Sequence, residues 1–192
     1  MGVLAVFLVG FMGSGKSTVG QELARRHRWD FVDLDALIKT REQASIPEIF
    51  ARAGEAGFRA AETSALLAVT ESLKTDTVVA LGGGAFAQET NRSLIGNWPS
   101  VFLEAPLDEL WRRSAEQETP GRPLRKDREQ FSRLYAQRLP FYRQATATIE
   151  TFGKEIDTIC REVEQRLCLP APYADLAYRQ PDSADSESGG LK

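Results

Sequence analysis

The stretch that decides the fold of this chain is Gly10-Phe11-Met12-Gly13-Ser14-Gly15-Lys16-Ser17. It follows an apolar run at 4–9, typical of a strand buried on both faces, and precedes residues 16–27, which carry apolar positions at helical spacing. The pattern G-x-x-x-x-G-K-[ST] between a strand and a helix is typical of a phosphate-binding loop. We therefore expect a nucleoside triphosphate site, and the alternative of an ordinary glycine-rich turn fits this context less well.

The physical basis of this prediction is the backbone of the loop. Its glycines allow a tight turn that points successive N–H groups at phosphate oxygens, and the helix N-terminus adds a partial positive charge. Lys16 can reach the transferable phosphate, and the Ser17 hydroxyl can bind Mg²⁺. The candidate nucleotide-binding residues here are Gly13, Ser14, Gly15, Lys16, Ser17 and Thr18.

The rest of the chain alternates strand-like and helix-like segments. Further strands are predicted at 31–32, 77–81, 101–103 and 148–150. Helical patterns are predicted at 16–27, 47–73 (broken near Gly54 and Gly57), 88–95, 106–117, 127–144 (interrupted by Pro140) and 154–168. Such alternation favours an α/β domain with a parallel sheet. We expect one domain over 1–169 and a flexible acidic tail over 170–192, with docking of the tail through Tyr173, Leu176 and Tyr178 as the alternative.

Composition excludes several classes of protein. Lys and Arg total 24 against 27 for Asp and Glu, a net charge of −3, so no nucleic-acid partner is expected. A serine–histidine triad or a histidine-rich zinc site would need His27, the one histidine of the chain. No segment approaches the roughly 18 apolar residues of a membrane span. Cys160 and Cys168 have neither zinc nor CxxC spacing, which favours reduced, partly buried thiols in a cytoplasmic protein.

Two carboxylates follow the second predicted strand. Asp33 and Asp35 stand where open α/β sheets bind their ligands. On an extended chain both would point to one side, about 6–7 Å apart. One could hold Mg²⁺ while the other accepts a proton from a substrate hydroxyl. The alternative is that one caps the next helix and the other is solvated.

Glycines and arginines form a third group of candidates. Gly82-Gly83-Gly84 directly follows a buried strand, which favours close backbone approach to a ligand over a mobile linker. Arg59, Arg122 and Arg138 lie in Gly-Phe-Arg, Arg-Pro-Leu and Arg-Leu-Pro-Phe-Tyr sequences. Spacing alone would not separate these arginines from ordinary surface charges.

Taken in order, these motifs resemble the shikimate kinase family, over about residues 4–167. The resemblance implies a three-layer, P-loop kinase fold with a five-stranded parallel sheet of order 2-3-1-4-5. It also implies a substrate-binding helical region at about 36–62, a lid at about 114–127, and a monomer. The chain departs from the family at Arg125, where many members have leucine, and at 152–155, where members often present basic and proline residues to adenine.

The resemblance further implies ATP-dependent phosphorylation of the 3-hydroxyl of shikimate, in the synthesis of chorismate and aromatic amino acids, with Mg²⁺. The implied catalytic residues are Lys16, Asp35 as the base, and Arg122 on the lid. Shikimate is expected to contact Asp35, Arg59, Gly82, Gly83, Gly84 and Arg138. In addition to the residues of the phosphate-binding loop, ATP is expected to contact Arg113 and Arg122. The expected Mg²⁺ ligands are Ser17 and Asp33. A gluconate kinase and a regulatory P-loop protein are the competing hypotheses.

Overall fold

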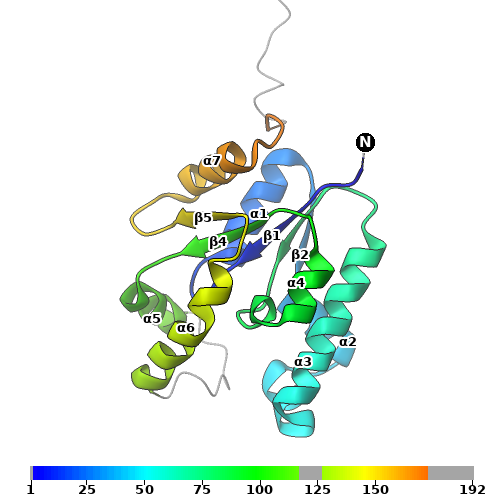
Figure 1. Cartoon of the computed structure of the whole chain (residues 1–192), viewed down its shortest axis with the longest axis vertical. Helices are drawn as coiled ribbons and strands as arrows, with labels where there is room; N and C mark the ends of the chain where they lie inside the picture. Colours follow the sequence, from blue (N-terminus) through cyan, green and yellow to red (C-terminus); the bar gives the residue numbers. More distant parts are fainter. Residues whose placement is uncertain (1, 117–126, 173–192) are drawn as a thin grey trace, which may run out of the picture.

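A five-stranded parallel sheet with the order β2-β3-β1-β4-β5 forms the centre of the molecule (Figure 1). The computed structural model describes residues 2–116 and 127–172. The strands are β1 (Ala5–Val9), β2 (Asp30–Asp33), β3 (Thr77–Ala80), β4 (Ser100–Glu104) and β5 (Ala147–Glu150). Both the parallel arrangement and the strand order predicted above are confirmed.

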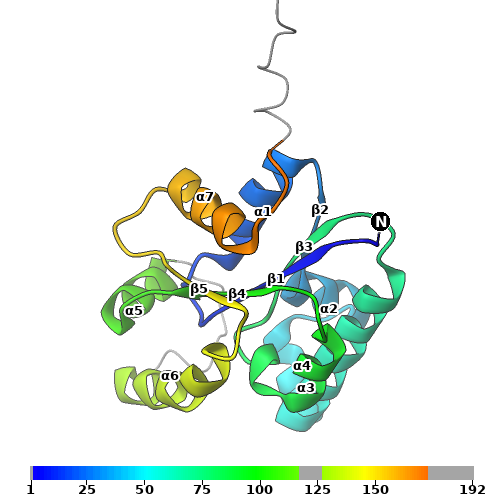
Figure 2. The same cartoon turned by 45° about the horizontal axis from the view of Figure 1, so that its top comes forward.

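Helices cover both faces of this sheet, which gives three layers (Figure 2). They are α1 (Lys16–His27), α2 (Leu34–Glu42), α3 (Ile46–Ser72), α4 (Glu89–Ile95), α5 (Leu107–Glu116), α6 (Arg128–Tyr142) and α7 (Ile156–Leu167), with a 3₁₀ turn at Ala85–Ala87. Helices α1 and α7 pack on one face, and α2 to α6 on the other. The first strand therefore lies between two apolar layers.

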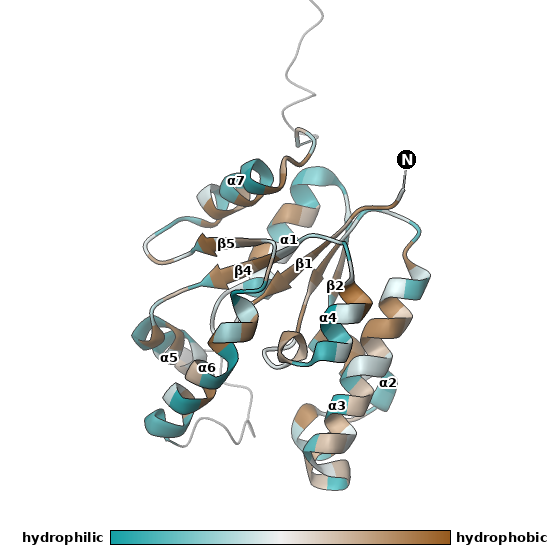
Figure 3. Cartoon of the chain, in the orientation of Figure 1, coloured by the Kyte–Doolittle hydropathy of each residue, from teal (hydrophilic) through white to brown (hydrophobic). Residues whose placement is uncertain are grey.

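The alternation of side chains along β1 divides the core in two. Ala5, Phe7 and Val9 pack with the α2–α6 layer, whereas Val6 and Leu8 pack with α1 and α7. All five side chains are fully buried. Figure 3 shows hydrophobic strands at the centre and many hydrophilic residues on the surrounding helices. A central parallel strand needs apolar residues on both faces, which is why the run at 4–9 could be recognised.

Helix α3 carries a bend that positions part of the site. Its start is held by a capping box in which Ser45 and Glu48 exchange hydrogen bonds, with Pro47 in the first turn. The break lies at Gly54, whose φ of 65° is in the left-handed region. The predicted second break at Gly57 is wrong, because that residue is helical.

Two other predictions need correction. Pro140 does not interrupt α6, which continues to Tyr142: the proline gives up the hydrogen bond of its own backbone nitrogen, but it lies in the last turn, where little of the helix follows it. The two thiols also differ from one another. Cys160 is buried between α7 and α1, where burial raises the pKa of its thiol to about 12, whereas Cys168 is exposed.

Some predicted features lie outside the described residues. These are Arg122 and Arg125, most of the lid at 114–127, and the tail from residue 173 onward. Over the described ranges, no helix has the length and apolar character that crossing a membrane requires.

Candidate active site

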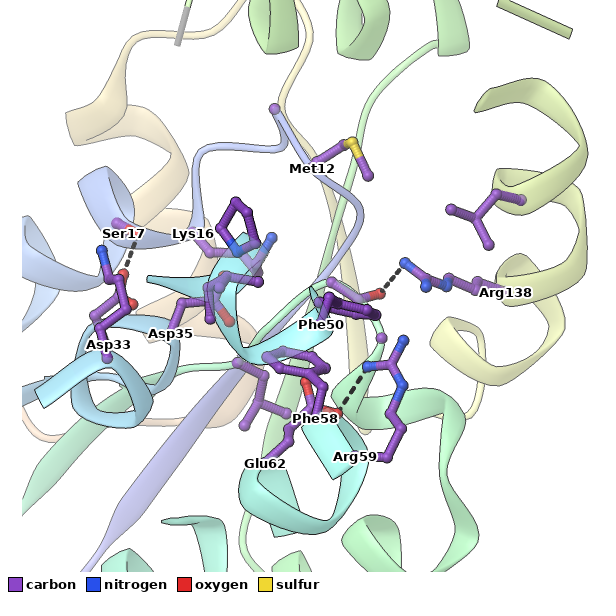
Figure 4. A pocket seen from close by; sticks show the side chains of 18 of the residues that line it. Met12, Lys16, Ser17, Asp33, Asp35, Phe50, Phe58, Arg59, Glu62 and Arg138 are labelled. Carbon is purple, nitrogen blue, oxygen red and sulfur yellow. Dashed lines mark hydrogen bonds and ion pairs between the residues drawn. The ribbon is translucent and has the colours of Figure 1, made fainter. Parts of the chain in front are cut away.

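A cavity of about 540 Å³ opens at the carboxyl ends of the central strands. Its wall combines the phosphate-binding loop, α2, the first half of α3, the glycine triplet after β3, and α6. Open α/β sheets bind their ligands at this edge because the loops that follow neighbouring parallel strands meet there. Figure 4 shows the side chains that point into this cavity.

The phosphate-binding loop forms one side of the cavity. Gly13 has a φ of 79° and lies so close to α5 that a Cβ atom there would approach the carbonyl oxygen of Leu110 to 2.7 Å. Lys16 begins α1, and its Nζ donates to the carbonyl oxygen of Phe11 at 2.9 Å. The ammonium group is thus folded back over the loop, beside the N–H groups at the start of the helix.

Asp33 joins the loop to the second strand. Ser17 Oγ donates to Asp33 Oδ2 at 2.6 Å, and Asp33 Oδ1 accepts the N–H of Ala36 at 3.0 Å (Figure 4). Asp33 is therefore the cap of α2, as one of the two alternatives predicted, and it is also a neighbour of Ser17. A hydroxyl and a carboxylate side by side are hard oxygen donors of the kind that Mg²⁺ prefers.

Asp35 lies in the same cavity, but not as the extended-chain argument predicts. The helix capped by Asp33 begins at Leu34, so Asp35 occupies its first turn, and the extended chain from which the 6–7 Å spacing was predicted is wrong, although both side chains do line the same cavity. The side chain instead faces the glycine triplet, because a Cβ on Gly82 would lie 2.6 Å from Asp35 Oδ1. This contact explains why the first residue of the triplet has no side chain.

Arg59 and Arg138 reach the triplet from two different helices. Arg138 Nη1, from α6, donates to the carbonyl oxygen of Gly83 at 3.1 Å. A Cβ on Gly84 would come within 2.5 Å of Arg59 Nη1, from α3. Both guanidinium groups line the cavity, so neither is an ordinary surface charge.

Sequence reasoning missed a buried acid next to Arg59. Glu62 is fully buried, and its Oε2 accepts from Arg59 Nη1 at 2.9 Å and from Gln88 Nε2 at 2.7 Å. Burial raises the pKa of Glu62, and the charge of Arg59 offsets part of that rise. The i,i+3 spacing from Arg59 on a helix was the available signal, although many surface pairs share it.

A tyrosine and an aromatic wall were missed as well. The hydroxyl of Tyr142 donates to the same Gly83 carbonyl oxygen that Arg138 contacts, and burial raises the pKa of this hydroxyl well above its usual range. Phe50 and Phe58 stack with their ring centroids 4.6 Å apart and close the α3 side of the cavity. The cavity thus offers polar groups on one side and an apolar surface on the other.

A second cavity of about 320 Å³ adjoins the other side of the phosphate-binding loop. Arg113, from α5, lines it, with its Nε bonded to Glu109 at 2.6 Å. Thr151 and Lys154 line it from the loop after β5, a segment from which the sequence analysis assigned no residue. Only the fold shows that this loop lies beside Gly13–Thr18.

Comparisons with known proteins agree with this geometry. The family model described as shikimate kinase matches residues 12–168. A shikimate kinase of Geobacter metallireducens is 43% identical over 162 residues, which cover 82% of this chain and 88% of the relative. The structure of a shikimate kinase from Acinetobacter baumannii in complex with shikimate superposes with a TM-score of 0.80 at 33% identity, covering 86% of this chain and 93% of the other.

A more distant neighbour shows the fold alone. A gluconokinase from Sinorhizobium meliloti has a TM-score of 0.59 at 19% identity, covering 93% of this chain and 98% of its own. The sugar-acid kinases therefore share the architecture of this chain, while the close sequence similarity lies with the shikimate kinases.

Proposed function

The chain belongs to the shikimate kinase family, and from this premise we propose which residues carry out its reaction. The reaction is transfer of a phosphoryl group from ATP to the 3-hydroxyl of shikimate, a step in the synthesis of aromatic amino acids. One observation carries the assignment: Asp35, Arg59 and Arg138 all meet the glycine triplet in a cavity that Lys16 also lines.

Shikimate is held by its carboxylate. Arg59 and Arg138 provide two planar guanidinium groups, which match a carboxylate in geometry as well as in charge. The backbone of Gly82, Gly83 and Gly84 admits the ring closely because these residues have no side chains. Residues 36–62, which include Phe50 and Phe58, form the shikimate-binding region of a single domain that spans 1–169.

Phosphoryl transfer itself needs positioning and charge neutralisation more than covalent chemistry by the protein. The N–H groups of Gly13–Thr18 hold the phosphates of ATP, and Lys16 neutralises charge on the group that moves. The carboxylate of Asp35 accepts the proton of the attacking hydroxyl. Arg122, which lies outside the described residues, is the residue that we propose completes this charge neutralisation.

Mg²⁺ fits the oxygen donors found here. Ser17 and Asp33 would hold it, the other ligands being phosphate oxygens and water, as is usual for Mg²⁺ with nucleotides. Among the described residues, no group of three histidine, cysteine or acidic side chains forms a separate metal site. The ion would neutralise phosphate charge when bound.

The base of ATP occupies the second cavity, beside Arg113 and Lys154. A guanidinium over a planar aromatic base contributes about 0.5–2 kcal/mol. We expect Arg113→Ala to raise the Kd of ATP about threefold or more, with the Kd of shikimate unchanged, in calorimetric titrations. Arg161→Ala removes an exposed arginine of α7 and is the control. Weaker shikimate binding in Arg113→Ala would place Arg113 in the other site.

A monomer is what the resemblance to the family implies, and we keep it as part of the proposal. Two unpaired cysteines support a reducing compartment, the cytoplasm.

The choice of acceptor is tested by a substrate panel. With ATP and Mg²⁺, a coupled assay of ADP release is expected to show turnover with shikimate and almost none with gluconate or a nucleoside monophosphate. Gluconate is a flexible chain, so it cannot place its carboxylate and one hydroxyl as the rigid ring does without losing conformational entropy. A preference for gluconate would overturn the substrate assignment, and ADP release independent of any acceptor would indicate a regulatory P-loop protein.

A further inference from the structure

Arg59 is bonded to two carboxylates that differ greatly in their surroundings. Its Nη1 donates to Glu62 at 2.9 Å, and the side chain of Glu62 is 1% exposed. Its Nη2 donates to Glu55 at 3.3 Å, and the side chain of Glu55 is 72% exposed. The guanidinium assigned to the substrate's carboxylate is thus already in contact with an exposed carboxylate of the protein.

We propose that Glu55 competes with the substrate for Arg59: it occupies Nη2 of Arg59 in the empty site and is displaced by the carboxylate of shikimate. This inference rests on the proposed function, because it takes Arg59 as the group that binds that carboxylate. Both Glu55 and Arg59 line the cavity, and a Cβ on Gly84 would lie 2.6 Å from Nη2. The substrate's carboxylate and Glu55 therefore compete for the same donor.

The two acids are not equally able to leave. Glu62 has no access to water and also accepts from Gln88 at 2.7 Å, so its displacement would leave a buried charge without its cation. Glu55 can return to water at small cost, because an exposed ion pair is worth only about 0.2–1 kcal/mol. Its position immediately after the bend at Gly54 places it one helical turn before Arg59.

The consequence is a lower affinity for shikimate than Arg59 would give without Glu55. A neutral cyclic alcohol cannot displace Glu55 by charge, so Arg59 remains bonded to the protein and contributes nothing to its binding. Removal of the charge of Glu55 should therefore strengthen the binding of shikimate and leave that of the neutral alcohol nearly unchanged, because only the carboxylate has to displace Glu55.

The test is Glu55→Gln in the full-length protein, with the Kd of shikimate and of its neutral carboxamide measured by calorimetry. We expect the Kd of shikimate to fall about two- to fivefold, which corresponds to the upper part of the range for an exposed ion pair. The Kd of the carboxamide is expected to stay within about twofold of its original value, so that discrimination between the two increases. The KM of shikimate should fall while kcat is unchanged.

Glu42→Gln is the matched control. It removes the same charge from an exposed pair with Arg52 (2.7 Å), and Glu42 does not line the cavity. An unchanged or higher Kd of shikimate in Glu55→Gln, or an equal fall in Glu42→Gln, would overturn the inference. Arg59→Ala in the same assay distinguishes a failure of this inference from a failure of the proposed function. If Arg59→Ala leaves the Kd of shikimate unchanged, the assignment of Arg59 to the substrate's carboxylate is wrong.

Discussion

Asp35→Asn is expected to lower kcat for shikimate by about 10²–10⁴-fold, the range usual for the loss of a general base. Asparagine keeps the size of the side chain but cannot accept the proton of the attacking hydroxyl. The position of Asp35 makes this effect specific, because its Oδ1 faces Gly82 in the shikimate part of the cavity. The Kd of ATP should therefore stay within about twofold of its original value.

Single-turnover rates measure the expected loss of phosphoryl transfer, and calorimetric titration measures whether the Kd of ATP is unchanged. Asp30→Asn is a suitable control, since Asp30 is the first residue of β2, at the end of that strand far from α2, and accepts a hydrogen bond from Thr75 at 2.5 Å, away from the cavity. That variant should keep its kcat. If Asp35→Asn instead abolishes ATP binding, Asp35 serves the metal or the structure and not the acceptor hydroxyl.

Arg59→Ala is expected to lower kcat/KM for shikimate by about 10²-fold or more, chiefly through KM. Truncating one partner of a desolvated charge pair costs about 2–5 kcal/mol, and the substrate's carboxylate loses its bidentate donor. Arg52→Ala, on the same helix but outside the cavity, should be nearly without effect. Steady-state kinetics over a wide range of shikimate concentration separates KM from kcat, and an unchanged KM would contradict the clamp.

The same substitution also changes stability, through Glu62. Burial raises the pKa of this acid above 4.5, and removal of Arg59 takes away the charge that offsets the rise. An acid whose pKa is higher when folded than when unfolded contributes stability at low pH that is lost as the pH rises through its folded pKa. The Tm of Arg59→Ala should therefore fall as the pH increases above about 4.5. Adding Glu62→Gln should remove this dependence without restoring shikimate binding.

Local patterns predicted most of the architecture. The run at 4–9 is apolar at every position because β1 is covered on both faces, and the loop ending at Ser17 needs glycine at particular positions to fit phosphate. The prediction for Asp35 was wrong because a single hydrogen bond changed the secondary structure of the segment. The cap formed by Asp33 starts α2 one residue after the strand, which moves Asp35 from an extended segment into a helix.

The same distinction between local and long-range contacts applies to the residues of the candidate site. The phosphate-binding loop and the cap at Asp33 are made by groups a few residues apart, whose hydrogen bonds depend on backbone conformation that the residue types encode directly. The meeting of Tyr142 and Arg138 with the carbonyl of Gly83, and the approach of Lys154 to the phosphate-binding loop, join segments dozens of residues apart. Those contacts follow from which strands become neighbours and how the helices pack on them, and residue spacing along the chain carries no record of that arrangement.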